Sequence, residues 1–337
     1  MNAALVIGSI FISLLTLEVG LRAYHDEWGY TNFRFPQSNK FGGYNTYDAE
    51  LGWVPKPGFV GTTVTILENG IRSNGPEEVG KGTDDPILAV GDSYTFGDQV
   101  RDSETWPAQL EKLSGRTVIN GGGDGYGVDQ TFLRARRFLS RDQFSIVIFS
   151  FIPNDIRRSQ MSVMFATAKP YFDFKDGRLT LENVPVPRPS FLPNKESGML
   201  ITLEHSRLMH TISKRLFPEW WLRAPPEKEE QNRETGIKVV CVLLHELEAL
   251  TKSHRSELIV LAQHGETESA SESMAAKSVL SCVSDPATRV IDLAPRLSEL
   301  RAKDPARYHR LYNPFLHMSA EGNQFVAREI LPTLMER

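Results

Sequence analysis

The chain has 337 residues, of which 40% are hydrophobic, 24% charged and 9% aromatic. These proportions are typical of a globular protein and exclude a disordered or fibrous chain, and the length allows one large or two small domains. With 38 Lys and Arg against 42 Asp and Glu, the net charge is −4, so there is no basic surplus and we expect no nucleic-acid partner. Two cysteines, Cys241 and Cys282, exclude a disulfide-rich scaffold. No histidine cluster has zinc-like spacing, and we expect neither a metal nor a cofactor.

The first element is an uncharged apolar run over residues 3–17, which Glu18 ends. Fifteen residues are fewer than the ~20 that span a bilayer, but extension to Leu21 gives a nearly adequate length with its acid near the end. No Lys or Arg precedes the run and no small-residue cleavage site follows it. We therefore expect residues 1–25 to be an uncleaved membrane anchor, with a cleaved signal segment or a buried helix as alternatives. An extracytoplasmic location would favour a disulfide between Cys241 and Cys282.

Residues 26–85 are rich in Gly, Pro, Asn and Thr and predict loops and short strands that lead into the main domain. From Pro86 onward, short apolar strands alternate with helices, a pattern that calls for a parallel sheet covered on both faces. The expected strands are 87–90, 117–119, 145–151, 258–262 and 290–292, and the expected helices are 106–113, 128–139, 238–250 and 319–335. The fold class is α/β: a three-layer α/β/α, flavodoxin-like sandwich with about five parallel strands over residues 86–337.

An insertion over residues 158–235 interrupts this alternation. It contains alternating polar and apolar stretches, a proline-rich segment at 185–193 and the aromatic pair Trp220 and Trp221. Two interpretations remain open. The insertion is either a lid or substrate flap over the site, or an excursion with a small core of its own.

Polar residues follow three of the predicted strands. In an open parallel sheet, ligands bind at the carboxyl ends of the strands. Ser93 follows the first strand and begins a helix, where the helix amino terminus lowers the cost of negative charge on a nucleophile. The glycine-rich run 120–125 follows the second strand, and Asn154 follows the third; backbone and amide N–H groups there can stabilise an oxyanion. His317, just before the last helix, is a candidate general base.

These segments resemble, in order along the chain, the four motifs of the SGNH (GDSL) hydrolase family. They are Gly-Asp-Ser-Tyr-Thr-Phe-Gly at 91–97, the glycine-rich run at 120–127, Pro-Asn-Asp at 153–155, and His-Met-Ser-Ala-Glu-Gly-Asn at 317–323. The resemblance covers about residues 86–335. It implies Ser93 as nucleophile, His317 as base, and an oxyanion hole formed by the Ser93 and Gly125 backbone N–H groups and the Asn154 side chain. It further implies that Asp92 and Asp155 hold loops in place.

Two positions depart from the family pattern. Ile152 stands where the third motif usually has glycine. The aspartate that usually precedes the histidine by two or three residues is absent, because Phe315 and Pro314 occupy those positions. The group that orients His317 is therefore open between Asn313, Asp292 and a backbone carbonyl.

The resemblance implies a serine esterase that hydrolyses O-acyl, above all O-acetyl, esters on cell-surface carbohydrate through an acyl-Ser93 intermediate. An O-acetyltransferase of polysaccharide biosynthesis is one alternative. A non-catalytic glycan-binding or assembly protein is another, favoured by the missing aspartate. By analogy with membrane-tethered members, we expect a single anchor in a bacterial inner membrane and a periplasmic domain that acts on acylated carbohydrate.

Simpler interpretations compete at each position. Ser93 alone could cap its helix, and Asn154 could be a turn residue. His309 is the one serious competitor of His317, while His245 and His264 are expected to be surface or packed residues. The glycine run lacks the following acid of a dinucleotide-binding fingerprint, and we reject that function.

Overall fold

The protein is described by a computed structural model that covers residues 3–25, 43–76, 85–164, 167–188, 206–217, 233–314 and 317–335. Its centre is a parallel sheet of five strands in the order β11-β10-β5-β3-β4. The strands are β3 (Ile87–Val90), β4 (Val118–Asn120), β5 (Ile146–Phe151), β10 (Glu257–Ala262) and β11 (Arg289–Asp292). Each lies within one residue of its predicted range, so the predicted α/β class and strand number are confirmed.

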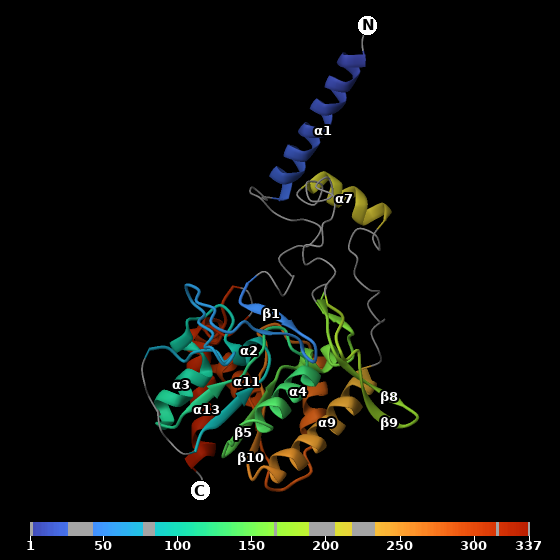
Figure 1. Cartoon of the computed structure of the whole chain (residues 1–337). Coiled ribbons are helices and arrows are strands. Elements are labelled where there is room, and N and C mark those ends of the chain that lie inside the picture. The colour runs from blue at the N-terminus through green and yellow to red at the C-terminus, as the bar shows by residue number, and fades with distance from the viewer. Residues whose placement is uncertain are drawn as a thin grey trace.

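Helices cover both faces of this sheet, as Figure 1 shows. Alternate strand residues point to opposite faces: Leu88 and Val90 pack into one apolar cluster, and Ile87 and Ala89 into the other. The first cluster includes residues of α4 (Val128–Leu139), α9 (Arg233–Ser253) and α10 (Ala270–Leu280). The second includes residues of α3 (Trp106–Ser114), α11 (Ala294–Lys303) and α13 (Ala320–Met335). The predicted three layers are thus present, although the sequence analysis did not anticipate α10 and α11.

Residues 43–76 pack into the main domain. Strands β1 (Asn45–Asp48) and β2 (Gly52–Pro55) form an antiparallel hairpin, and Leu51 and Trp53 within it are fully buried. The Trp53 indole donates to the Asp124 carbonyl at 2.8 Å, and the Tyr126 hydroxyl donates to the Trp53 carbonyl at 2.7 Å. This segment therefore holds the glycine-rich loop through hydrogen bonds at Trp53, and it is part of the domain as well as the lead-in that the sequence predicts.

The first part of the insertion is also built into the domain. It contains β6 (Val163–Met164), β7 (Thr167–Ala168), and the hairpin of β8 (Tyr171–Lys175) and β9 (Arg178–Glu182). Lys169 is fully buried and forms an ion pair with buried Asp129 of α4. Phe172 packs edge-on against Phe132 of α4, with ring centroids 6.1 Å apart. This part of the insertion shares the core of the domain, whereas Trp220 and Trp221 lie outside the described residues.

Two helices lie apart from the sheet (Figure 1): α1 (Ala3–His25) and α7 (Arg207–Leu216). They are joined by Glu18 of α1, whose carboxylate accepts hydrogen bonds from the Ser206 hydroxyl and from the backbone N–H groups of Arg207 and Leu208, at 2.8–2.9 Å. Glu18 thereby satisfies donors at the amino terminus of α7. Within the described residues, no helix meets the length and apolarity needed to cross a membrane.

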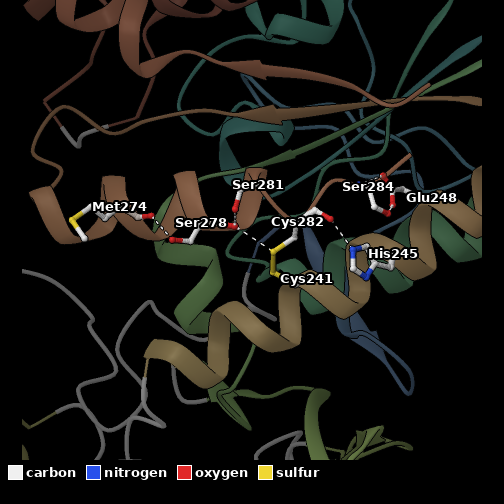
Figure 2. The surroundings of a disulfide bond; sticks show 8 residues. All are labelled: Cys241, His245, Glu248, Met274, Ser278, Ser281, Cys282 and Ser284. Carbon is white, nitrogen blue, oxygen red and sulfur yellow. Dashed lines mark hydrogen bonds between the residues drawn. A yellow bond between two sulfur atoms is a disulfide. The ribbon is translucent and has the colours of Figure 1, made fainter. Parts of the chain in front are cut away.

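A disulfide joins Cys241 of α9 to Cys282, which follows α10, and Figure 2 shows the bond between the two segments. The Cα atoms are 5.4 Å apart across 41 residues of sequence. The His245 ring lies beside the bridge, with its Nε2 2.7 Å from the Cys282 carbonyl. The pairing left conditional by the sequence is therefore present, and it ties together two helices on the same face of the sheet.

Candidate active site

Ser93 is the first residue of the short helix α2 (Ser93–Phe96), directly beyond the carboxyl end of β3. The preceding residue, Asp92, caps this helix by accepting a hydrogen bond from the Tyr94 backbone N–H at 3.0 Å. Gly91 allows the sharp turn, because a Cβ there would lie 2.1 Å from the Thr95 hydroxyl. Ser93 is only 4% exposed, so its hydroxyl is held in a defined direction at the edge of the sheet.

His317 reaches Ser93 from the opposite end of the sequence. Its Nε2 lies 3.0 Å from the Ser93 Oγ, across 224 residues of sequence. A bridge between Tyr312 and Met318 closes the turn that carries the histidine. The Tyr94 ring packs against the imidazole, with centroids 5.3 Å apart. The structure thus places the predicted nucleophile and the predicted base within hydrogen-bonding distance.

Neither side chain proposed to orient His317 contacts its ring. The Nδ1 atom is buried and has no hydrogen-bond partner within the described residues, which exclude 315 and 316. The Asn313 side-chain oxygen accepts instead from the backbone N–H of His317, at 3.3 Å. Asp292 accepts from the Ala294 N–H at 2.9 Å and lies 2.8 Å from the His264 Nε2. Of the three alternatives for the group that orients His317, Asp292 is thus engaged elsewhere: at the end of β11, this carboxylate pairs with His264.

Asp92 and Asp155 are buried around one guanidinium. Arg158 Nη1 lies 2.7 Å from Asp155 and 3.6 Å from Asp92, and Asp155 also accepts from the Ile152 N–H at 3.0 Å. Burial raises the pKa of Asp92, and burial together with the nearby Asp92 charge raises the pKa of Asp155. Through Arg158, these two carboxylates link the loop after β3 to the loop after β5.

The glycine-rich loop runs alongside the loop that carries Ser93. Gly121 donates to the Ala89 carbonyl at 2.8 Å, and Gly123 donates to the Gly91 carbonyl at 2.9 Å. Gly122 lies so close to α2 that a Cβ would be 2.3 Å from the Phe96 nitrogen. Gly125 has a φ of +70°, a conformation that side chains rarely adopt. The loop containing Gly125 is therefore held beside α2 by backbone contacts that require glycine.

Asn154 lies in the first turn of α5 (Pro153–Arg158), beyond the carboxyl end of the neighbouring strand β5. It lines a cavity of about 160 Å³ together with Tyr94, whose ring packs on His317. It also lines a second cavity of about 350 Å³, between α5, α9 and α10. Its side-chain oxygen accepts a long hydrogen bond, 3.4 Å, from Arg157. This arrangement leaves the amide N–H₂ as the group that can donate to a substrate oxygen.

Two other histidines are paired with acids. His264, at the end of β10, is buried between Glu268 at 2.5 Å and Asp292 at 2.8 Å. Burial opposes protonation of His264, but the two carboxylates outweigh it and raise its pKa to about 9. His309, the competitor of His317, is exposed and bonds through Nδ1 to Glu266 at 2.5 Å. A surface or packed position was predicted for His264, but its two acid partners were not, because Asp292 reaches it only through the pairing of β10 with β11 and Glu268 lies four residues further on in a loop.

Comparison with known proteins gives structural neighbours only. No family model and no curated protein matches the sequence. An alpha/beta hydrolase enzyme from the metagenome of Lake Arreo, Spain, is 14% identical, with coverage of 74% of this chain and 94% of its own and a TM-score of 0.44. A protein assigned to the G-D-S-L lipolytic family of Desulfitobacterium hafniense is 13% identical, with coverage of 74% and 99% and a TM-score of 0.42. A family two carbohydrate esterase from Clostridium thermocellum is 9% identical, with coverage of 78% and 66% and a TM-score of 0.41. The fold and the site define an α/β protein with a serine–histidine pair at the carboxyl edge of its parallel sheet.

Proposed function

We propose that the protein is an SGNH-type serine esterase that cleaves O-acyl esters, above all O-acetyl esters, of carbohydrate. The observation that supports this function is the 3.0 Å contact between the Ser93 Oγ and the His317 Nε2 at the end of β3. A nucleophile and a base within hydrogen-bonding distance are the minimum that acyl transfer through a serine requires. All the residues of the proposed reaction belong to the four motifs that resemble this family.

In the proposed reaction, the Ser93 oxygen attacks the acyl carbonyl carbon while His317 Nε2 accepts the hydroxyl proton. The tetrahedral oxyanion accepts hydrogen bonds from the Ser93 N–H, the Gly125 N–H and the Asn154 amide. Collapse of this intermediate breaks the bond to the sugar oxygen, which leaves as a hydroxyl after it receives the proton from His317. Water then attacks the acyl-Ser93 ester with the same base, and the carboxylic acid is released.

One feature, the lack of a carboxylate beside His317 in the described part of the chain, bears both on the rate and on the alternative function. The carboxylate that normally stabilises the protonated imidazole has no equivalent among the described residues. Because that carboxylate fixes the tautomer and orientation of the ring, we expect slower turnover than in an esterase with a complete triad. The same absence supports the second candidate function, a glycan-binding or assembly protein with a degenerate site.

Activation of Ser93 can be tested without knowledge of the substrate. The full chain is exposed to a fluorophosphonate and its intact mass is measured beside Ser93→Ala and His317→Ala. We expect one adduct on the wild type and on a control, Ser140→Ala, whose serine is exposed at the end of α4. Both site variants should remain unmodified.

A folded wild type that takes up no adduct would reject the esterase in favour of the binding protein. If Ser93 is labelled, incubation with an acetylated glycan and a free acceptor glycan separates the two catalytic candidates. Acetate as the sole product would exclude the O-acetyltransferase, whereas an acetylated acceptor would establish it.

We further propose that α1 attaches the protein to a bacterial inner membrane, with the domain on the periplasmic side. Apolar side chains of α1, including Ile12, Leu14, Leu15 and Leu17, are about half exposed or more, and no described element covers them. The disulfide between Cys241 and Cys282 supports an oxidising compartment such as the periplasm.

A further inference from the structure

The larger cavity beside Asn154 has the size and lining of a ligand site. It measures about 350 Å³, within the range of small-molecule pockets, about 300–1,000 Å³. Asn154 and Arg157 enter it from α5, Gln160 follows that helix, Arg233 begins α9, and Glu272 belongs to the first turn of α10. Because Asn154 is the proposed oxyanion donor, a group bound here would belong to the same substrate whose ester is cleaved.

The lining of this cavity carries more positive than negative charge. Within the described residues, no carboxylate lies at ion-pair distance from Arg157 or Arg233; both side chains are exposed, and both act on Glu272 only through longer-range electrostatic attraction. The single acid, Glu272, accepts hydrogen bonds from the Ser269 N–H at 2.8 Å and hydroxyl at 2.6 Å, which commits its carboxylate to capping α10. Two guanidinium groups therefore face one carboxylate that is already hydrogen-bonded elsewhere.

The acids of the adjoining smaller cavity do not supply the missing partners. Glu266 bonds to His309 and Glu268 to His264, each at 2.5 Å. Gln160 adds a second unsatisfied group: it is nearly fully buried, and its side-chain carbonyl oxygen has no hydrogen-bond partner in the described part of the chain. A buried acceptor without a donor is costly, and a sugar hydroxyl could satisfy it.

We propose that this cavity binds a negatively charged sugar residue, with its carboxylate held by Arg157 and Arg233 and a hydroxyl donating to Gln160. Guanidinium groups bind carboxylates through two parallel hydrogen bonds, which gives both affinity and orientation. The inference rests on the proposed action on carbohydrate esters and narrows their class to acidic glycans, such as those built from uronic acids. The ester to be cleaved would then lie next to the bound acidic residue, at Asn154.

Binding can be measured without catalysis on the full chain carrying Ser93→Ala. Titration with a galacturonic acid trisaccharide, followed by calorimetry, is compared with a galactose trisaccharide of the same length. We expect the acidic sugar to bind at least 10-fold more tightly. The added changes Arg157→Ala and Arg233→Ala should remove that difference, and lysine at both positions should restore only part of it because the forked geometry is lost.

Arg141→Ala is the matched control, since this arginine lies after α4, in the turn that precedes the amino end of β5, and its removal should leave binding unchanged. Glu272→Gln gives a test that misfolding cannot imitate: it removes the one negative charge and should tighten acidic-sugar binding several-fold.

Equal binding of the two sugars, no binding of either at 10 mM, or insensitivity to the arginine changes would overturn the proposal. Stronger binding of galactose 6-phosphate than of galacturonic acid would overturn the carboxylate assignment. Because these outcomes do not depend on turnover, they are separable from failure of the esterase itself.

Discussion

At the scale of single residues, the candidate site depends on donors whose positions are set by backbone geometry. Ser93 is held by the Asp92 cap and by Gly91, and His317 by the bridged turn between Tyr312 and Met318. Asn154 differs from these two, because it is half-buried at the junction of two cavities. It can therefore be changed with little effect on packing, which makes it the best residue for separating chemistry from folding.

Asn154→Ala should lower kcat on a model ester about 100–1,000-fold, because one hydrogen-bond donor to the oxyanion is lost. The melting temperature should change little, since among the described residues the Asn154 side chain accepts just one long hydrogen bond, 3.4 Å, from Arg157. Arg157→Ala is the useful comparison, because it removes the hydrogen bond to the Asn154 oxygen and keeps the Asn154 amide group that is proposed to donate to the oxyanion. A rate that Asn154→Ala leaves intact would remove this residue from the oxyanion hole.

At the scale of elements, contacts between chain segments far apart in sequence join the helices and strands of the domain. The disulfide joins α9 to the end of α10, and loop-closure entropy for 41 residues corresponds to about 4 kcal/mol of stability. Lys169 and Asp129 join the insertion to α4 in a buried pair. His264, Glu268 and Asp292 connect the carboxyl ends of β10 and β11, the strands on the side of the sheet away from β4.

The His264 contacts predict a pH-dependent stability. The pKa of His264 in the folded chain is about 9 against an ordinary 6.5, so folding favours its protonated form. This stabilisation is fully present below about pH 6.5 and is lost as the pH rises toward 9. At 1.36 kcal/mol per unit, the loss is about 3 kcal/mol.

Denaturant unfolding of wild type and His264→Gln at pH 6, 7.5 and 9 measures this effect. The wild type should lose more free energy of unfolding over this range than the variant, by up to about 3 kcal/mol. His254→Gln is the control, since this side chain forms no ion pair with described residues. Parallel pH profiles for wild type and His264→Gln would show that the cluster does not bind an extra proton.

At the scale of the whole molecule, one compact α/β domain carries two helices that stand apart from it (Figure 1). Residues 43–76 and the described residues of the hairpin β8–β9 both pack into its core, through Leu51 and Phe172 respectively. Helix α1, by contrast, keeps its apolar side chains exposed and contacts α7 through Glu18. An exposed apolar helix in an otherwise well-packed protein marks an interaction surface, and the proposed occupant of this surface is a membrane.

Membrane attachment through α1 predicts the distribution of the chain in cells. In a bacterial host, the full chain should sediment with the membrane fraction and resist extraction by carbonate at high pH, because apolar burial in lipid does not depend on charge. A chain that lacks residues 1–25 should be found in the soluble fraction, and a Leu14→Ala variant, which keeps most of the apolar run, should still sediment. Recovery of the full chain in the soluble fraction would contradict the anchor.

The local patterns of the sequence were sufficient for the sheet, the three layers and the segments that form the site. Apolar runs such as 87–90 specify buried parallel strands, and because Ser93, the glycine loop and Asn154 each follow such a strand, they were predicted to share one edge of the sheet. The position of His317 beside Ser93 was predicted from the resemblance, and the structure has the two in contact.

Other features depended on how distant segments pack, which no local pattern reports. Three such contacts join residues between 28 and 71 positions apart. Asp292 pairs with His264 instead of His317, Trp53 supports the glycine loop, and Lys169 is buried against Asp129. Periodicity reveals which face of an element is buried but not which side chain meets it there. The partners of buried charges are chosen by the full three-dimensional arrangement, because an unpaired charge in the interior is costly wherever its partner lies in the sequence.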